Sequence, residues 1–113
     1  MCAAHYRLSN LTAIIDANKV AQSSHVAHLV DIEPLADKWR AFGWEVREID
    51  GHDMGQIVDA LETIPFNALK PSALIAHTVK GKGVSFAENT YVWHSNTVND
   101  ETFARALAEL EAL

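Results

Sequence analysis

Apolar residues form short runs along the chain, and polar stretches of differing length separate them. Residues 11–16 form a nearly continuous apolar run, which is typical of a strand buried on both faces of a parallel sheet. Residues 73–76, opened by Pro71, predict another strand. Residues 44–49 alternate loosely between apolar and charged side chains, which indicates a strand nearer the edge of the sheet.

Helices are predicted where apolar residues recur every three or four positions. Residues 1–7 have the composition of the end of a helix, and a helix that starts without a cap suggests that sequence is missing upstream. Three later helices carry apolar stripes, made by Leu35, Trp39 and Phe42, by Ile57, Leu61 and Ile64, and by Phe103, Leu107 and Leu110.

Capping and breaking residues indicate where these three helices begin and end. Side chains that accept hydrogen bonds from a first helical turn are expected ahead of each stripe. The expected caps are Asp31, followed by Pro34 in the first turn, then Asp53 with Gln56, and finally Asn99 or Asp100. Gly43 and Pro65 are expected to end the first two helices.

Helices and strands therefore alternate along the chain. Strands separated by helices imply right-handed crossovers, so we expect an α/β fold in which a parallel sheet forms the middle of three layers, with helices on both sides. Two long polar loops, residues 17–31 and 77–98, each follow a strand. Ligands of such sheets bind beyond the carboxyl ends of the strands, so both loops are expected at the end that holds a site.

Composition narrows the class of protein. The 113 residues suffice for one domain, and 49% of them are hydrophobic, as in a globular protein. The net charge of −6 and the absence of a Lys/Arg run argue against a nucleic-acid partner, and no apolar stretch is long enough for a membrane span. Cys2 is the single cysteine, so the chain has no internal disulfide, which favours a reducing, cytoplasmic setting. We interpret Cys2 as a small buried apolar residue.

Asn18 is the first candidate for chemistry, since it comes just after the run of residues 11–16. An amide oxygen at the end of a buried strand can bind a hard cation, and nearby backbone carbonyls can add ligands. The alternative on spacing alone is an Asn that bonds to its own backbone in a turn.

Lys80, Gly81, Lys82 and Gly83 form a second candidate. Glycine lets the backbone approach a ligand closely, and lysine can pair with phosphate. The segment lacks the spacing of a P-loop. A solvated basic loop is the simpler interpretation of these residues alone.

Histidines are the third group of candidates. His25 and His28 can share a helical face and bind a metal, although no third ligand is placed by the sequence and surface histidines explain them as well. His94 lies on the second long loop, at the expected ligand end. His52 is interpreted as a turn residue, and His77 as the end of a strand. No Ser/His/Asp order or nucleophile elbow is present.

Taken together, these stretches resemble the amino-terminal, diphosphate-binding domain of transketolases over nearly the whole chain. The chain looks most like the amino-terminal subunit of transketolases that are split into two chains. The stretches that carry the resemblance are residues 3–6, 10–18, 32–44, 50–53, 77–85 and 93–94.

The resemblance implies thiamine diphosphate held through Mg²⁺. The family signature opens with Gly-Asp-Gly and closes with an Asn that Asn18 matches, so the Asn18 side chain and the Val20 carbonyl are implied as metal ligands. Such oxygen ligands suit an octahedral Mg²⁺. His94 matches a histidine that reaches the cofactor diphosphate and the reacting centre, and is thus implied as the catalytic residue. Lys80 matches a position that lines the same pocket.

The sequence departs from the family pattern in three places. The Gly-Asp-Gly half is absent, so residues 1–113 are expected to form a single partial domain, the carboxyl-side part of the thiamine diphosphate-binding fold. The run after the metal-binding Asn differs at residues 19–23. In the family a Lys often follows the Trp-His pair, and Ser95 and Asn96 stand there in this chain. The resemblance therefore does not imply the contact of that lysine with a substrate phosphate.

The implied activity is transfer of a two-carbon ketol unit between sugar phosphates, as in the pentose phosphate pathway. The glutamate that activates the cofactor belongs to the family's pyrimidine-binding domain, expected here on a carboxyl-terminal partner subunit. We expect the chain alone to be inactive. The alternatives are a non-catalytic remnant that binds or scaffolds, and a fragment of a dihydroxyacetone or deoxyxylulose phosphate synthase. A strand without a neighbour also predicts homo-oligomers or association through an exposed sheet edge.

Overall fold

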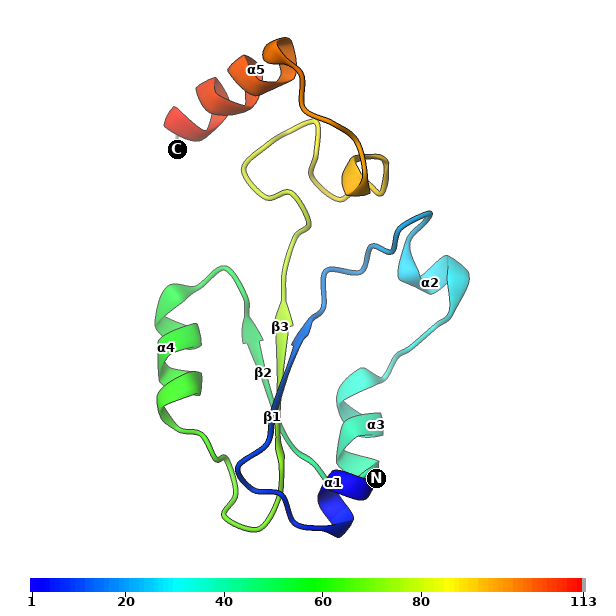
Figure 1. Cartoon of the computed structure of the whole chain (residues 1–113), viewed down its shortest axis with the longest axis vertical. Coiled ribbons are helices and arrows are strands. Elements are labelled where there is room, and N and C mark those ends of the chain that lie inside the picture. Colours follow the sequence, from blue (N-terminus) through cyan, green and yellow to red (C-terminus); the bar gives the residue numbers. More distant parts are fainter. Residues whose placement is uncertain (113) are drawn as a thin grey trace. The chain divides into compact units, whose positions relative to one another are not determined.

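The computed structural model describes residues 1–112, which divide into two compact units (Figure 1). The first unit comprises Met1–Ala17 and Ile32–Thr78, and the second comprises Asn18–Asp31 and Val79–Leu113. The first unit holds α1 (Cys2–His5), β1 (Thr12–Asp16), α3 (Leu35–Ala41), β2 (Glu45–Asp50), α4 (Met54–Glu62) and β3 (Ser72–His77). The second unit holds α2 (Val26–Leu29), the 3₁₀ helix η1 (Val92–His94) and α5 (Asp100–Glu111).

A three-stranded parallel sheet in the order β1-β3-β2 forms the middle layer of the first unit. In Figure 1, α4 covers one face of this sheet, and α1 and α3 lie on the other. The expected three-layer α/β fold is thereby confirmed. Because all strands run the same way, β1 and β3 end at the same edge, where the Ala17 amide donates to the Ala76 carbonyl at 2.8 Å.

The core is centred on β3, which has a strand on each side. Ala73, Leu74 and Ile75 are at most 2% exposed. Ser72 is completely buried, and its hydroxyl accepts a 3.0 Å hydrogen bond from the Phe66 amide, which satisfies the polar group inside the core. The middle position in the sheet explains why the sequence of β3 is a short apolar run.

The prediction for β1 was half right. The strand forms where expected, but it is not buried on both faces, since Ile14 is 62% exposed. In the described part of the chain, β1 has one strand beside it, and α4 packs over β2. The side chain of Ile14 is accordingly open to solvent.

The predicted edge position of β2 and the predicted cap of α4 are confirmed. β2 lies at an edge of the sheet, with Arg47 and Glu48 exposed. Asp53 caps α4, because its carboxylate accepts from the Gln56 amide at 3.1 Å and from the Gln56 side chain at 2.9 Å. The hydrogen bond from the Gln56 backbone, followed by that from its side chain, lowers the pKa of Asp53 below its usual value.

The expected start of α3 was wrong. Asp31 does not cap this helix, and Pro34 is not inside its first turn, because Pro34 itself occupies the cap position. The Glu33 carboxylate takes the capping role by accepting from the Leu35 amide at 2.9 Å. The helix ends as predicted, with Gly43 just beyond it at φ +87°, a conformation that favours glycine.

Both long loops contain structure that the hydrophobic pattern did not indicate. The loop of residues 17–31 includes α2, and the loop of residues 77–98 includes η1. The cap of α5 was predicted correctly: Asn99 and Thr102 form a capping box, with each side chain accepting from the other residue's amide at 2.9 Å.

The interpretation of Cys2 as buried was wrong, because Cys2 is exposed. α1 is four residues long and has no buried residue, while Ala4 comes close to Gly43. Ala4 therefore faces the rest of the unit, and Cys2 faces solvent. Among residues 1–112, no helix is both long and apolar enough to cross a membrane.

Candidate cofactor and metal site

Asn18 lies two residues beyond β1 and forms a turn with its own backbone. Its side-chain oxygen accepts a 2.9 Å hydrogen bond from the Val20 amide. Lys19, between them, has φ +65°. The turn interpretation of Asn18 is therefore correct. This turn does not exclude a metal, because an amide oxygen carries two lone pairs and can accept more than one interaction.

Val20 is held in place by a short antiparallel bridge to His25. The bridge is accompanied by two backbone hydrogen bonds of 2.9 Å each, from Val26 to the Lys19 carbonyl and from Ala21 to the Ser24 carbonyl. Neither bond uses the carbonyl of Val20, and the side chain of Val20 is buried. Hydrogen bonds therefore close the backbone around Asn18 and Val20. Both implied metal ligands, the Asn18 side-chain oxygen and the Val20 carbonyl, belong to this closed segment.

His25 and His28 lie beside this turn as a pair of neighbouring rings. His25 is the N-cap of α2 and His28 lies within it, with their ring centroids 5.9 Å apart and nearly perpendicular. No group of three or more His, Cys, Asp or Glu side chains able to hold a metal exists among residues 1–112. The two histidines therefore form a ring pair, in which His28 is exposed and His25 is half-buried.

His94 is the last residue of η1, and its imidazole is exposed. The His94 amide donates to the Tyr91 carbonyl at 3.0 Å, which closes this helical turn. The Tyr91 ring meets the ring of His25 edge-on, with 6.5 Å between the centroids. Through this contact, the second unit brings the segment of Val20 and the segment of His94 together.

Lys80 begins a compact loop rather than an open one. Its carbonyl accepts a 3.0 Å hydrogen bond from the Asn89 amide, which closes the loop. Gly81 has φ +71°, and a Cβ there would stand 2.5 Å from the Ala87 carbonyl oxygen. Glycine is therefore required at this position by both its conformation and the close backbone, which is a structural reason for the Lys-Gly-Lys-Gly sequence.

A cluster around Glu109, which the sequence pattern missed, attaches α5 to this loop. The Glu109 carboxylate accepts from the Ser85 amide at 2.5 Å and from the Ser85 hydroxyl at 2.8 Å, and Arg105 donates to it at 3.3 Å. Arg105 also lies over the ring of Phe86, 4.7 Å from its centroid, and Phe86 packs on Trp93. Ser85 and Glu109 are too far apart in the sequence for spacing to reveal the pair.

The attachment of α5 is expected to weaken in acid. The Ser85 amide, and after it the Ser85 hydroxyl, lowers the pKa of Glu109 below its ordinary value of 4.5. A carboxylate with a lowered pKa stabilises the folded state above that ordinary value, and the contribution is lost as the pH falls through the folded pKa. We therefore expect the Ser85 amide NMR signal to shift as the pH falls below 4.5. Glu109→Gln should abolish this shift, whereas Glu62→Gln in α4 should leave it unchanged.

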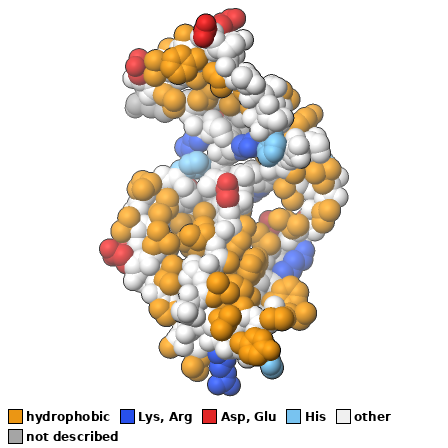
Figure 2. All heavy atoms as spheres, viewed as in Figure 1, with side chains coloured by type: hydrophobic (Ala, Val, Ile, Leu, Met, Phe, Trp, Pro, Cys, Tyr) orange, Lys and Arg blue, Asp and Glu red, His pale blue; other side chains and the backbone are white. Residues whose placement is uncertain are grey.

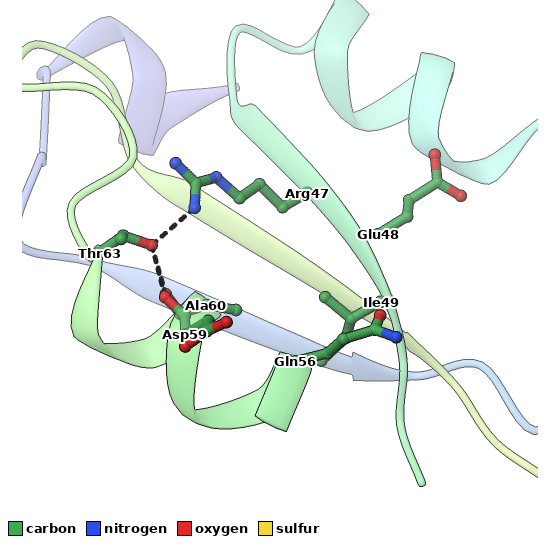
Figure 3. A pocket seen from close by; sticks show the side chains of 7 residues that line it. All are labelled: Arg47, Glu48, Ile49, Gln56, Asp59, Ala60 and Thr63. Carbon is green, nitrogen blue, oxygen red and sulfur yellow. Dashed lines mark hydrogen bonds between the residues drawn. The ribbon is translucent and has the colours of Figure 1, made fainter. Parts of the chain in front are cut away.

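A separate hollow of about 380 Å³ lies in the first unit, between β2 and α4. Figure 3 shows Arg47 reaching Thr63, to which it donates at 2.6 Å, and Thr63 in turn reaching the end of α4. None of the residues singled out from the sequence as ligands lines this hollow. The hollow therefore does not belong to the candidate site. The guanidinium of Arg47, which lines it, already donates to the Thr63 hydroxyl.

Comparison with known proteins identifies the family. The family of the transketolase thiamine diphosphate-binding domain matches residues 1–110. The chain belongs to this family. The likeness noted in the sequence is thereby confirmed, together with thiamine diphosphate as the ligand after which the domain is named.

Relatives of this transketolase domain include proteins described as subunits. The chain is 42% identical over 111 residues to the 6-deoxy-6-sulfo-D-fructose transketolase subunit SqwG of Clostridium sp. (strain MSTE9). It is 38% identical over 110 residues to an apulose-4-phosphate transketolase subunit of Phocaeicola vulgatus. These matches include 98% and 97% of the chain but 40% and 39% of the two relatives, so the chain spans about 40% of their length.

A solved structure supports the same conclusion for the transketolase fold. The transketolase of Campylobacter jejuni superimposes with a TM-score of 0.86 at 29% identity. The superposition covers 97% of this chain and 17% of the Campylobacter chain.

Proposed function

We propose that this chain supplies one half of a thiamine diphosphate and Mg²⁺ site in a transketolase that transfers a two-carbon ketol unit between sugar phosphates. The observation that supports the proposal is the closed turn after β1, in which the Asn18 side-chain oxygen accepts from the Val20 amide. Two neutral oxygen ligands suit Mg²⁺, which prefers oxygen and keeps near-octahedral geometry.

These two oxygens fit only part of a Mg²⁺ site. Magnesium in proteins is usually bound by one or two carboxylates together with phosphate oxygens of the ligand. The family resemblance assigns the missing carboxylate to the Asp of a Gly-Asp-Gly segment, which the sequence of this chain does not contain. In the proposal, residues 1–113 act as the carboxyl-side part of the diphosphate-binding domain, and the Asp comes from another segment.

His94 and Lys80 complete the part of the pocket that this chain contributes. We place the exposed imidazole of His94 against the cofactor diphosphate and the reacting centre, where it can donate a hydrogen bond or hold a proton. Lys80 lines the same pocket, and its ammonium can pair with phosphate. The bound cofactor supplies an electron sink for the carbanion left when a ketose is cleaved.

The proposal also requires a partner chain. Several relatives are named as transketolase subunits, and this chain covers less than half of their length. We infer that the pyrimidine-binding domain, with the glutamate that activates the cofactor, belongs to a separate carboxyl-terminal subunit. Sugar phosphates or closely related sugars are the substrate class, as the relatives named for sulfofructose and apulose phosphate suggest.

Mixing experiments test this function. Ketol transfer between sugar phosphates should be undetectable with the chain alone, and should appear when chains that supply the Gly-Asp-Gly segment and the pyrimidine-binding domain are added. The complementing chains without this chain are the control. Turnover by the isolated chain would contradict the half-site. Failure with every complementing chain would instead favour a role in binding or scaffolding.

A further inference from the structure

All four residues of the candidate site belong to the second unit. Asn18 and Val20 come from its first segment, and Lys80 and His94 come from its second segment. Figure 2 shows histidine side chains at the surface, and His94 is among the exposed residues, so its imidazole can be reached by a ligand. Because the two segments are far apart in the chain, contacts inside the unit set how the turn after β1 lies relative to His94.

His25 is fixed to the turn by its backbone. It forms the antiparallel bridge with Val20, and the amide of the next residue, Val26, donates to the Lys19 carbonyl at 2.9 Å. His25 is the N-cap of α2, but its side chain makes no capping hydrogen bond. The turn therefore sets the place of the half-buried His25 ring, and the ring itself is not needed to start the helix.

Tyr91 is fixed to His94 in the same way. It is the N-cap of η1, and its carbonyl accepts from the His94 amide at 3.0 Å. The rings of Tyr91 and His25 lie 6.5 Å apart between centroids at an interplanar angle of 89°, an edge-to-face arrangement that aromatic pairs favour. This contact therefore joins the turn after β1 to the helical turn that ends in His94.

A second ring contact holds η1 at Trp93. The centroid of the Trp93 ring lies 4.9 Å from that of Phe86, and the guanidinium of Arg105 in α5 lies over Phe86. This contact attaches η1 to the other elements of residues 79–113. If the Tyr91 ring loses its contact with His25, η1 therefore keeps its attachment through Phe86 and loses the ring contact that holds it to the turn.

We propose that His25 is a positioning residue for His94. The inference rests on the proposed function, in which Asn18 and Val20 hold the metal and His94 contacts the diphosphate and the reacting centre. Through Tyr91, the His25 ring sets the separation between the turn and η1 that a bound diphosphate has to span. This role requires an aromatic ring at His25 and does not require the imidazole nitrogens.

The rate of ketol transfer by the assembly with the complementing chains tests the role of the ring. His25→Ala should lower kcat by about 3- to 10-fold, the effect expected from the loss of one aromatic pair. The Mg²⁺-dependent affinity for thiamine diphosphate should fall less than kcat, because backbone hydrogen bonds close the turn without the ring. His25→Phe should restore most of the rate, since it returns a ring without nitrogens.

The chain offers a matched control in its first unit. His5 and Tyr6 also form an edge-on ring pair, with 5.0 Å between the centroids, and His5 is exposed. His5→Ala removes the same atoms as His25→Ala from a pair that does not touch the candidate site. It should leave kcat unchanged, and circular dichroism checks that each variant folds.

A double variant tests whether His25 acts through His94. In a His94→Ala background, His25→Ala should lower the rate little further, since two residues that act through one contact are not additive. Full additivity would overturn the inference. So would a loss with His25→Phe as large as that with His25→Ala, because the imidazole itself would then be the active group.

NMR spectra of the whole chain without partners separate this inference from the proposed function. His25→Ala should shift the amide signals of Tyr91 and His94, whereas His5→Ala should leave both in place. An unmoved His94 signal in His25→Ala would overturn the link even in an active assembly. A complete lack of turnover with the unchanged chain, together with a shifted His94 signal, would contradict the proposed function and leave the link between the two segments standing.

Discussion

Asn18→Ala is expected to weaken Mg²⁺-dependent binding of thiamine diphosphate by about 100-fold. Removing a residue that only hydrogen-bonds to a metal ligand typically costs about 10- to 100-fold in metal affinity, and Asn18 is proposed as a ligand itself. The substitution removes the side-chain oxygen that the proposed site offers to the metal. It also removes the acceptor of the Val20 amide, so the Val20 carbonyl is no longer held beside the metal. The measurement is titration calorimetry on the assembly with the complementing chains.

Two matched variants separate the metal role of Asn18 from its role in the turn. Asn18→Asp retains an oxygen that can accept from the Val20 amide and bind Mg²⁺, so the affinity should be largely kept. Lys19→Gly relaxes the residue at φ +65° without touching the amide of Asn18, and should change the affinity little. If Asn18→Ala and Asn18→Asp bind the cofactor as the unchanged chain does, Asn18 is a turn residue only.

Leu74→Ala is expected to lower the free energy of unfolding by about 3 kcal/mol, within the range for truncation of a buried leucine. Leu74 lies in the middle strand, is 2% exposed, and pairs with β1 on one side and β2 on the other. The loss combines the transfer of apolar surface with the cavity left behind. Such a loss is a large share of the stability of a domain of this size, so urea unfolding should show it clearly.

Leu69→Ala is the matched control, because it removes the same atoms from a side chain that is 65% exposed. Surface substitutions of this kind usually change stability by at most about 0.5 kcal/mol. Both variants should be compared at one protein concentration, since self-association adds to the apparent stability. Equal losses for the two variants would mean that β3 is not the centre of the core.

Much of the fold could be predicted from local sequence signals. The three strands, the Asp53 and Asn99 caps, and Gly43 at the end of α3 depend on residues that are neighbours in the chain. The order of the strands could not be predicted in this way. The apolar runs of β1 and β3 look alike, yet β3 is central and Ile14 of β1 is exposed, because only the packing decides which strand receives two neighbours.

The candidate site shows the same limit more strongly. Spacing alone made Asn18 a turn residue, and the hydrogen bond to Val20 shows that the turn exists. Its interpretation as a metal ligand came from the family resemblance. Contacts between distant residues, such as Ser85 with Glu109 and His25 with Tyr91, gave no local signal, because no periodicity connects positions so far apart.

Titration of thiamine diphosphate with Mg²⁺ into the isolated chain, and into the chain mixed with its complementing chains, tests the half-site most directly. The chain alone offers Asn18 and Val20 but no metal-binding carboxylate beside them from a Gly-Asp-Gly segment. We therefore expect no measurable binding to the chain alone, and Mg²⁺-dependent binding, abolished by EDTA, in the mixture. Tight binding by the isolated chain would contradict the half-site, as would binding in the mixture that does not need Mg²⁺.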